Sequence, residues 1–548
     1  MKAILSNRLY VPKLAFTSGK FDPSVLGEFE YRVTNKVEGP NQEVIEEVTI
    51  VSAYNETPTT YGFCRGNMHK LQRLFPGIKW DDARTYVESE FTPRFITDFP
   101  KPQARKLMVE VRPADCNDPP ATLRPDQMRA VSQFIEALEG GGGGGILHAD
   151  TGWGKSIASL YIITLLGMKT VLFVEEEACG RNWLQEFYTH TNASMLEKVM
   201  GAPKLAGFYG RDAKPGFFFP FLTVATYQSF IRNDVLKLHR GDFGVQWVDE
   251  VDRAGAWCFS VAMNIPSAAI RGGCTATLTR NDGLQDLVYD VIGPPVARGV
   301  EKMLTCEVYI EDPDVEIPQA TGAYWWTTAI SSLVGSDAKS RRKGSGGSAK
   351  YLQYLAKRVI EDAEAGRFIL VVGERNRLAF SLKDEILRQL SEKPGAKLAP
   401  EDIDVLVGTS DRGGVIDKAR SGSCRVVLGQ AKLLRRAINV RRWDCLYVAT
   451  PMSGWAKSRR DIPLKNRTLD DVNPELLQLV GRIRRPLPGE NKPTPIVRDF
   501  IVRGDGRLVA SIQGRVSAYR TMGFAVSGDE AVTKKAGPVD PASASRWF

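Results

Sequence analysis

Histidine is rare in this chain, and its cysteines are isolated from one another. The 548 residues include only four histidines, and the eight cysteines are scattered with no CxxC pair. Zinc sites and disulfide frameworks need Cys and His ligands at short spacing or cysteines in a paired set. The sequence therefore argues against both kinds of site, and unpaired thiols favour a reducing compartment.

A long uninterrupted apolar segment is also missing. The first residues, MKAILSNRLYVP, lack the apolar core and the small-residue cleavage site of a signal peptide. The most apolar stretch, residues 156–174, is interrupted by Gly167 and Lys169. Because a membrane span needs about 20 apolar residues in a row, we interpret this stretch as a buried helix followed by a buried strand. We expect a soluble protein with no membrane partner.

The overall composition is that of an ordinary globular protein. Hydrophobic residues make up 43% of the chain and charged residues 25%, which excludes fibrous, collagen-like and wholly disordered classes. At roughly 150 residues per domain, the length predicts about three to four domains. The net charge of +9 suits a polyanionic partner but does not require one.

Two regions of the chain alternate helical stretches with short apolar runs. The runs are ILHAD, TVLFV, FLTVAT, VQWVDE and GGCTATL in residues 116–305, and RFILVVG, DVLVG, RVVLGQ, DCLYVAT and TPIVRDFI in residues 351–525. This alternation predicts an α/β domain with a doubly wound parallel sheet in each region. Residues 1–115 are predicted to form a small α+β domain, residues 306–350 a linker or insertion, and residues 526–548 a disordered tail.

A phosphate-binding loop is predicted between a strand and a helix. Residues 149–156 read ADTGWGKS, which matches the phosphate-loop pattern with Ala149 in place of the first glycine. Glycines in such a loop let backbone N–H groups close around phosphate oxygens at a helix N-terminus. We therefore predict an ATP and Mg²⁺ site in which Lys155 pairs with the β- and γ-phosphates. The hydroxyl of Ser156 would ligate Mg²⁺, and Thr151, Gly152 and Gly154 would complete the loop.

The second part of a nucleotide site is the acidic strand end VQWVDEVD. Here Asp249 is predicted to hold Mg²⁺, and Glu250 to orient the attacking water. Acidic residues often follow an apolar strand, so the motif alone is modest evidence. After a phosphate loop in the same predicted sheet, it indicates a nucleoside triphosphatase.

The order of the motifs resembles that of superfamily 2 helicases. LRPDQ at residues 123–127 is similar to the element before the phosphate loop, in which Gln127 would read adenine beside Arg124. The other similar segments are TYQ at 226–228, DEVD at 249–252, TAT at 275–277, RNDG at 280–283 and QLVGRIRR at 478–485. The RNDG segment and the late IVRDFI and YRTMGF segments are most similar to UvsW-type phage helicases and their XPB-like relatives.

The resemblance implies two tandem RecA-like motor domains and a nucleic-acid-stimulated ATPase. It assigns Gln478, Arg482 and Arg485 to catalysis, Thr275 and Thr277 to coupling, and Thr226 to nucleic-acid binding. The two arginines would stabilise charge on the γ-phosphate, an effect worth roughly 10³–10⁵ in rate. A basic exposed helix is the alternative interpretation of this segment. Arg484, which is offset from both, is expected to face solvent or nucleic acid.

The sequence departs from the family pattern at three places. Glu175, Glu176 and Glu177 stand where Pro-Thr is usual, and carboxylates there would repel a phosphate backbone, so we expect no nucleic-acid contact. Leu278 replaces the usual proline after TAT. Ala437 and Asn439 stand where Gly and Asp are common, and no firm catalytic role is assigned to them.

A basic segment is predicted to contact the nucleic-acid backbone. Residues 425–460 contain nine lysines and arginines against one acid, Asp444. Such a concentration of charge suggests phosphate contacts, and a solvated basic face is the alternative. Trp443 and Trp455 lie among these charges, and core packing is the preferred interpretation for both. The predicted contacts are Arg435, Arg436, Arg441 and Arg442.

The N-terminal region is not basic overall, with 16 basic against 15 acidic residues in positions 1–115. The segment FCRGNMHKLQRLF predicts a short helix with Leu71 inward and a basic exposed face. That face would comprise Arg65, His69, Lys70 and Arg73, of which Lys70 and Arg73 are the predicted nucleic-acid contacts. The Arg-Gly turn before the helix resembles the N-terminal domains of the same phage helicases. A substrate-positioning domain and a purely structural cap are both compatible with this pattern.

The leading hypothesis is an ATP-dependent DNA helicase or translocase that remodels branched or forked DNA in recombination, repair or replication. Its expected location is the cytoplasm of a bacterial or phage-infected cell. The alternatives are a double-strand translocase with little unwinding, an RNA helicase, and a nucleotide-dependent binding switch without turnover. Intact Lys155, Glu250, Arg482 and Arg485 argue against the switch. The end of the tail, Trp547 and Phe548, is a candidate contact for a protein partner.

Overall fold

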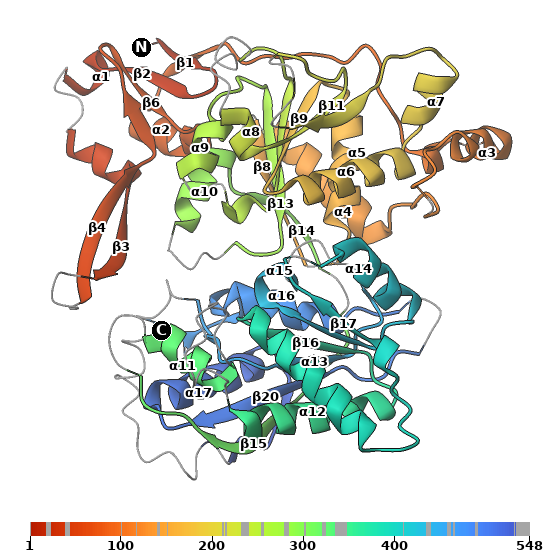
Figure 1. Ribbon diagram of the computed structural model, residues 1–548. Helices are drawn as coiled ribbons and strands as arrows, with labels where there is room; N and C mark the ends of the chain where they lie inside the picture. The colour runs from red at the N-terminus through yellow and green to blue at the C-terminus, as the bar shows by residue number, and fades with distance from the viewer. Residues whose placement is uncertain are drawn as a thin grey trace. The chain divides into compact units, whose positions relative to one another are not determined.

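The computed structural model divides the chain into two compact units (Figure 1). The first comprises Met1–Thr34, Val48–Leu278 and Gly283–Glu301, and the second Asn35–Glu47, Thr279–Asp282 and Lys302–Phe548. The structure describes residues 2–17, 23–38, 44–99, 101–116, 118–139, 143–150, 152–210, 213, 216–231, 240–253, 257–278, 284–300, 303–320, 325–334, 348–408, 410–434, 440–456, 462–463, 466–487, 491–530 and 532.

The first unit is built on a seven-stranded parallel sheet in the order β10-β11-β9-β12-β13-β8-β14. Its strands are β8 (Gly144–Ala149), β9 (Thr170–Val174), β10 (Ala206–Tyr209), β11 (Leu222–Thr226), β12 (Val245–Asp249), β13 (Ile270–Thr275) and β14 (Pro295–Gly299). Its helices are α4 (Pro125–Ala137), α5 (Lys155–Leu166), α6 (Glu177–His190), α7 (Ala193–Lys198), α8 (Tyr227–Ile231), α9 (Trp257–Met263) and α10 (Gln285–Ile292). Every residue of β9 is buried, as expected for a parallel strand covered on both faces.

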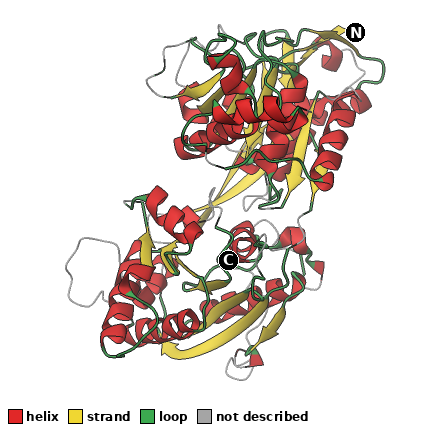
Figure 2. Ribbon diagram, turned by 90° about the vertical axis from the view of Figure 1, so that its right-hand side faces the viewer, coloured by secondary structure: helices red, strands yellow, loops and turns green. Residues whose placement is uncertain are grey.

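The second unit repeats this architecture, with strand order β17-β18-β16-β19-β20-β15-β21, all parallel. The strands are β15 (Glu307–Glu316), β16 (Ile369–Gly373), β17 (Ile403–Leu406), β18 (Val426–Gln430), β19 (Cys445–Val448), β20 (Ile496–Arg503) and β21 (Ala525–Ser527). The helices are α11 (Trp325–Val334), α12 (Ala349–Glu364), α13 (Asn376–Ser391), α14 (Arg412–Ser421), α15 (Ala431–Leu434), α16 (Pro474–Ile483) and α17 (Gly506–Thr521). Figure 2 shows helices packed around the strands in each unit. The predicted pair of RecA-like sheets is confirmed.

Two of the predicted boundaries are wrong. The predicted linker at 306–350 contains β15, which pairs with β20 over most of its length, and α11, which packs into the core. The strand was missed because its buried positions alternate with charged residues and Pro313 lies where its register shifts. The predicted tail at 526–548 begins inside β21, which pairs with β15. Residues 533–548 lie outside the described residues.

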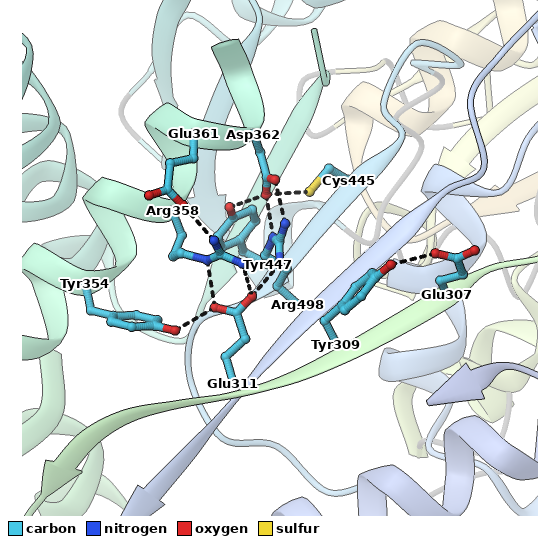
Figure 3. Close-up of polar contacts among 10 residues, drawn as sticks. All are labelled: Glu307, Tyr309, Glu311, Tyr354, Arg358, Glu361, Asp362, Cys445, Tyr447 and Arg498. Atoms are coloured by element: carbon cyan, nitrogen blue, oxygen red, sulfur yellow. Dashed lines mark hydrogen bonds and ion pairs between the residues drawn. The ribbon is translucent and has the colours of Figure 1, made fainter. Parts of the chain in front are cut away.

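A buried ion-pair network fastens α12 to the second sheet (Figure 3). Arg498 of β20 donates to Asp362 Oδ1 of α12 at 2.6 Å, and Arg358 of α12 donates to Glu311 of β15 at 2.8 Å. Burial would raise the pKa of Asp362, but the Arg498 guanidinium and the Tyr447 hydroxyl bring it below its usual range. The pairs explain how charged residues of β15 and β20 are accommodated within the sheet.

The N-terminal region forms a small α+β structure, as predicted. Its five-stranded sheet has the order β5-β6-β2-β1-β7, and β3 pairs with β4 in a separate two-stranded sheet. The elements are β1 (Lys2–Leu5), β2 (Leu9–Pro12), α1 (Leu14–Thr17), β3 (Glu30–Glu38), β4 (Val44–Ser52), β5 (Tyr54–Glu56), β6 (Thr60–Phe63), α2 (Met68–Leu74), β7 (Lys79–Asp82) and α3 (Pro102–Glu110). Its core is continuous with that of the first motor sheet, since Leu9 and Phe63 belong to the same cluster as Val291.

The apolar stretch at residues 156–174 forms α5 and β9, separated by Gly167 in a left-handed conformation with φ 65°. This confirms the interpretation of that stretch as a helix followed by a strand. In the part of the chain that the structure describes, no helix combines the length and the apolar character needed to cross a membrane.

Candidate nucleotide-binding site

The predicted phosphate loop lies between the end of β8 and the start of α5. Gly152 and Gly154 have φ values of 94° and 95°, a left-handed backbone that favours glycine. Lys155 and Ser156 are the first two residues of α5, so they stand beside the free backbone N–H groups of the helix N-terminus. This geometry suits a chain of phosphates. Thr151 lies outside the described residues.

The start of α4 is locked onto this loop through Gln127. The Gln127 side chain is 3% exposed, and its Nε2 donates to the Trp153 carbonyl at 2.9 Å while its Oε1 accepts from the Arg124 N–H at 3.0 Å. Arg124 Nη2 donates to the same carbonyl at 2.9 Å, and Trp153 Nε1 donates to Asp126 at 2.6 Å. Gln127 therefore holds the phosphate loop directly, and its contact with adenine stays a prediction.

The acidic strand end and the TAT segment meet on the same edge of the sheet. Asp249 ends β12, and Glu250 follows it with φ 52°, a rare conformation for a residue with a side chain. The Thr275 hydroxyl lies 3.4 Å from Glu250 Oε2 and 3.2 Å from Asp252 Oδ1, and it accepts from the Thr277 N–H at 3.1 Å. The structure thus brings Glu250, which is predicted for catalysis, together with Thr275, which is predicted for coupling.

Asp249 has partners on both of its carboxylate oxygens. Trp183 Nε1 donates to Oδ2 at 2.9 Å, and Cys274 Sγ lies 3.6 Å from Oδ1. Burial, together with the neighbouring Glu250 charge, raises the pKa of Asp249 to about 6, against the opposing effect of the Lys155 charge. Neither Trp183 nor Cys274 belongs to a predicted motif, so their contacts with Asp249 could not be predicted from the sequence.

These residues fit ATP with Mg²⁺. The two glycines and the N-terminus of α5 offer N–H groups to phosphate oxygens, and Lys155 adds a positive charge within electrostatic reach of Asp249. Ser156 and Asp249 supply the hard oxygen ligands that Mg²⁺ prefers. Lys155 would hold phosphate charge, and Ser156 with Asp249 would hold the metal.

In the second unit, α16 carries Gln478 and Arg482 and is followed by Arg485. The side chain of Asn473 caps the helix by accepting from the Glu475 N–H at 2.9 Å. Arg482 and Arg485 are only 5% and 2% exposed, which argues against the alternative of a basic exposed helix. Gln478 is partly exposed.

Comparisons with known proteins agree with the motifs. A family model described as "Type III restriction enzyme, res subunit" matches residues 121–280. A protein of Escherichia phage T5 named "Probable helicase D10" is 23% identical over 69% of this chain and 72% of its own length. The "DNA 3'-5' helicase XPB" of Kineococcus radiotolerans is 27% identical over 35% of this chain. The order of the motifs and these two relatives make the chain similar to superfamily 2 helicases.

The matched part of this chain spans 32% of the Kineococcus protein's length, so about two thirds of that relative has no counterpart in the match. The match to the crystal structure of T4 UvsW covers 96% of this chain and 98% of the other, at 13% identity and a TM-score of 0.34. The helicase names of these relatives support a nucleic-acid-dependent ATPase.

Thr226, Glu176 and Glu177 each lie at the start of a helix. The Thr226 hydroxyl accepts from the Ser229 N–H at 3.2 Å and donates to its hydroxyl at 2.8 Å, so it caps α8. Glu176 occupies the N-cap position of α6, and Glu177 in the first turn pairs with Arg181 at 2.6 Å. Carboxylates stabilise a helix N-terminus, which gives this departure from the family pattern a structural reason.

In the basic segment, Arg441 and Arg442 precede β19 and therefore lie at the amino ends of the strands. Parallel sheets commonly bind ligands at the opposite edge. Arg442 Nε donates to the Arg420 carbonyl at 3.0 Å. Lys492 Nζ donates to the carbonyls of Arg441 at 2.7 Å and Arg485 at 2.9 Å, so it joins two predicted sites that are separate in the sequence. Arg435 and Arg436 lie outside the described residues.

Two further expectations for the second unit have clear outcomes. Trp443 and Trp455 are 1% and 6% exposed, which confirms that both pack in the core. The expectation that Arg484 faces solvent or nucleic acid holds only in part, because its side chain is partly exposed and is also held within the unit. Its Nε donates to the Leu304 carbonyl at 2.9 Å, and its guanidinium lies 4.8 Å from the centre of the Phe524 ring.

The predicted basic face of α2 is only partly exposed. Lys70 forms an ion pair of 2.9 Å with Asp290 of α10, whose side chain is 2% exposed. Arg65 is 5% exposed and donates to the carbonyls of Ala268 and Ala269. These two residues are therefore wrongly predicted to be exposed, because helical periodicity cannot show that a second structure covers the outer face. Arg73, by contrast, has a 69% exposed side chain.

Proposed function

We propose that this chain is an ATP-dependent DNA helicase or translocase that remodels or unwinds branched DNA. The observation that supports it best is the meeting of Lys155, the Asp249–Glu250 pair and Thr275 at one edge of the first sheet. These residues combine a phosphate-binding loop, metal ligands and the segment expected to couple hydrolysis to nucleic acid. DNA, rather than RNA, is proposed because XPB-named relatives are DNA helicases by name.

Bound ATP would supply the phosphoryl group that is transferred to water, with ADP as the leaving group, and Mg²⁺ would offset the phosphate charge. The Lys155 ammonium balances phosphate charge, and the α5 N-terminus contributes N–H donors. The Glu250 carboxylate accepts a hydrogen bond from the attacking water and so orients it, with its own position set by Thr275. By their resemblance to the helicase motif, Arg482 and Arg485 would add positive charge during hydrolysis.

The N-terminal region is proposed to position the branch of the DNA. Arg65, Lys70 and Asn7 attach it to the first motor sheet through buried hydrogen bonds and an ion pair. A DNA arm held by this region would therefore follow the first motor sheet. His69 and Arg73 are exposed and are the remaining basic candidates on α2 for contact with that arm.

The proposal is tested by ATP hydrolysis and strand-displacement assays on the full chain. Single-stranded, duplex, forked and four-way DNA are compared with matched RNA. We expect DNA to stimulate turnover and forked or four-way DNA to be remodelled. Stimulation by RNA alone would contradict the DNA proposal, while duplex-stimulated turnover without strand separation would indicate a double-strand translocase. Turnover that no nucleic acid stimulates would contradict the function as a whole.

The position of the nucleic-acid track is tested by two paired variants. Replacing Arg435 and Arg436 with alanine should weaken DNA binding and reduce the slope of log affinity against log salt by about 0.9 for each phosphate that is no longer neutralised. The matched pair is Arg441→Ala with Arg442→Ala at the amino ends of the strands. Because the Arg442 side chain is hydrogen-bonded to the Arg420 carbonyl, we expect this double variant to change the slope less. The reverse order of effects would place the track at that edge.

A further inference from the structure

Asp249 is held by two side chains that come from different elements. Trp183 lies on α6 and is 3% exposed, and its indole N–H donates to Oδ2 at 2.9 Å. Cys274 lies on β13 and is fully buried, with Sγ at 3.6 Å from Oδ1. The carboxylate is therefore fixed in rotation as well as in position.

The indole contact is not a general consequence of burying tryptophan. Among the described residues, the buried indole N–H groups of Trp80, Trp247, Trp443 and Trp455 have no hydrogen-bond partner. The fold thus leaves several buried indoles without an acceptor, yet it directs that of Trp183 to the predicted metal ligand. A hydrogen bond from a neutral donor to an ionised carboxylate is stronger than one between neutral groups.

We propose that Trp183 is a positioning residue for the metal-binding carboxylate Asp249, with Cys274 as a secondary support on the other oxygen. The inference rests on the proposed function, since it assumes that Asp249 holds Mg²⁺. Partners that orient metal ligands in this way typically change metal affinity by about 10- to 100-fold when they are removed. Because Trp183 is on α6, the position of that helix sets the orientation of the carboxylate.

The test compares Trp183→Phe with Trp247→Phe in the full chain. Both replacements keep a buried aromatic ring in the same core cluster, but only the first removes a donor to Asp249. The readout is the binding of a fluorescent mant-ATP as Mg²⁺ is titrated, with a parallel measurement in EDTA. We expect Trp183→Phe to need about 10-fold or more Mg²⁺ for half-maximal binding, with binding in EDTA unchanged.

Trp247→Phe is expected to leave the Mg²⁺ midpoint at its original value, and circular dichroism checks that both variants are folded. For the secondary support, Cys274→Ser keeps a donor and should shift the midpoint less than Cys274→Ala. Equal midpoints for Trp183→Phe and the unaltered chain would overturn the inference. Lys155→Ala distinguishes a failure of the proposed function from a failure of the inference about Trp183. If Lys155→Ala still binds mant-ATP normally, the proposed function fails. If Lys155→Ala does not bind mant-ATP but Trp183→Phe has a normal Mg²⁺ midpoint, only the role of Trp183 is rejected.

Discussion

Lys70 and Asp290 form an ion pair across the junction between the N-terminal sheet and α10 of the first motor sheet, with Nζ and Oδ1 2.9 Å apart. The Tyr31 hydroxyl donates to the same carboxylate. At the neighbouring turn, Gly66 approaches α10 so closely that a Cβ would lie 1.8 Å from the Tyr289 carbonyl oxygen. Position 66 therefore requires glycine, and the Lys70–Asp290 ion pair holds the two parts together. This arrangement indicates a rigid attachment.

The first prediction is that Lys70→Met destabilises the chain, whereas Arg73→Met does not. Removing Lys70 leaves the Asp290 carboxylate buried without its cation, which we expect to cost about 3 kcal/mol. Arg73 pairs with exposed Glu28, so its replacement should cost less than about 0.5 kcal/mol. Thermal unfolding measures both, with a midpoint about 5 °C or more lower for Lys70→Met. Equal midpoints would show that the pair contributes little to the attachment.

Removing residues 1–115 would test the role of the N-terminal region less clearly than these single replacements do. It would expose core residues such as Val291, and it would remove strand bridges that Thr85 and Phe95 make with Ala268 and Thr191. A drop in activity would then follow from unfolding as readily as from the absence of a DNA-binding surface. Single replacements on α2 avoid this ambiguity.

The second prediction concerns hydrolysis. Lys155→Ala should lower ATP turnover by at least about 100-fold, because the phosphate charge loses its fixed partner. Glu250→Gln should retain ATP binding but hydrolyse slowly, because the amide keeps the shape and loses the acceptor charge. Steady-state turnover and equilibrium binding of mant-ATP separate the two effects. Unaltered turnover in Lys155→Ala would mean that the phosphate loop is wrongly assigned.

The central strands and the phosphate loop could be predicted because their signals are local. Strands such as β9 and β12 are covered on both faces, so they are short apolar runs that periodicity detects. The strands that sequence analysis missed lie at sheet edges, as β10, β14 and β21 do, or beside an edge, as β15 does. The signals of these strands are weak because β10 and β21 have only four and three residues, while β14 and β15 carry charged residues between their buried positions.

The motifs of the candidate site could be predicted from the sequence, but the residues that hydrogen-bond to those motifs could not. Glycine spacing identifies Gly152 and Gly154 because backbone conformation depends on the residues themselves. Trp183 and Lys492 are isolated in the sequence, and their roles depend on which carboxylate or carbonyl the fold brings to them. The same limitation explains the error at Lys70, whose helical position was predicted but whose partner on α10 was not.

The third prediction uses Arg484 as an internal control for Arg485. If Arg485 stabilises charge during hydrolysis, Arg485→Ala should lower turnover by about 10³-fold while changing mant-ATP affinity much less. Arg484→Ala removes a hydrogen bond to Leu304 and its packing against Phe524, so it should lower stability and leave turnover nearly unchanged. Turnover and thermal unfolding are measured for both. Weaker binding without slower turnover in Arg485→Ala would indicate an interaction made equally in the ground state.

The last prediction is a pH dependence that arises from Lys492. Burial, together with the nearby Arg485 and Arg441 charges, lowers the pKa of Lys492 to about 8, although the Asp444 carboxylate opposes this. In the unfolded chain the amine keeps its usual pKa near 10.4. Between these two values the unfolded state binds more protons than the folded state, so the free energy of unfolding should rise with pH.

Below about pH 8 the ammonium is charged in both states, and its burial then destabilises the folded chain in full. Lys492→Met removes the titrating group while retaining a long apolar side chain. We therefore expect the difference in unfolding free energy, the unaltered chain minus Lys492→Met, to increase from about pH 8 to pH 10. Urea unfolding across this range measures the difference. A difference that stays flat or falls with pH would show that Lys492 keeps its ordinary pKa beside Arg441 and Arg485.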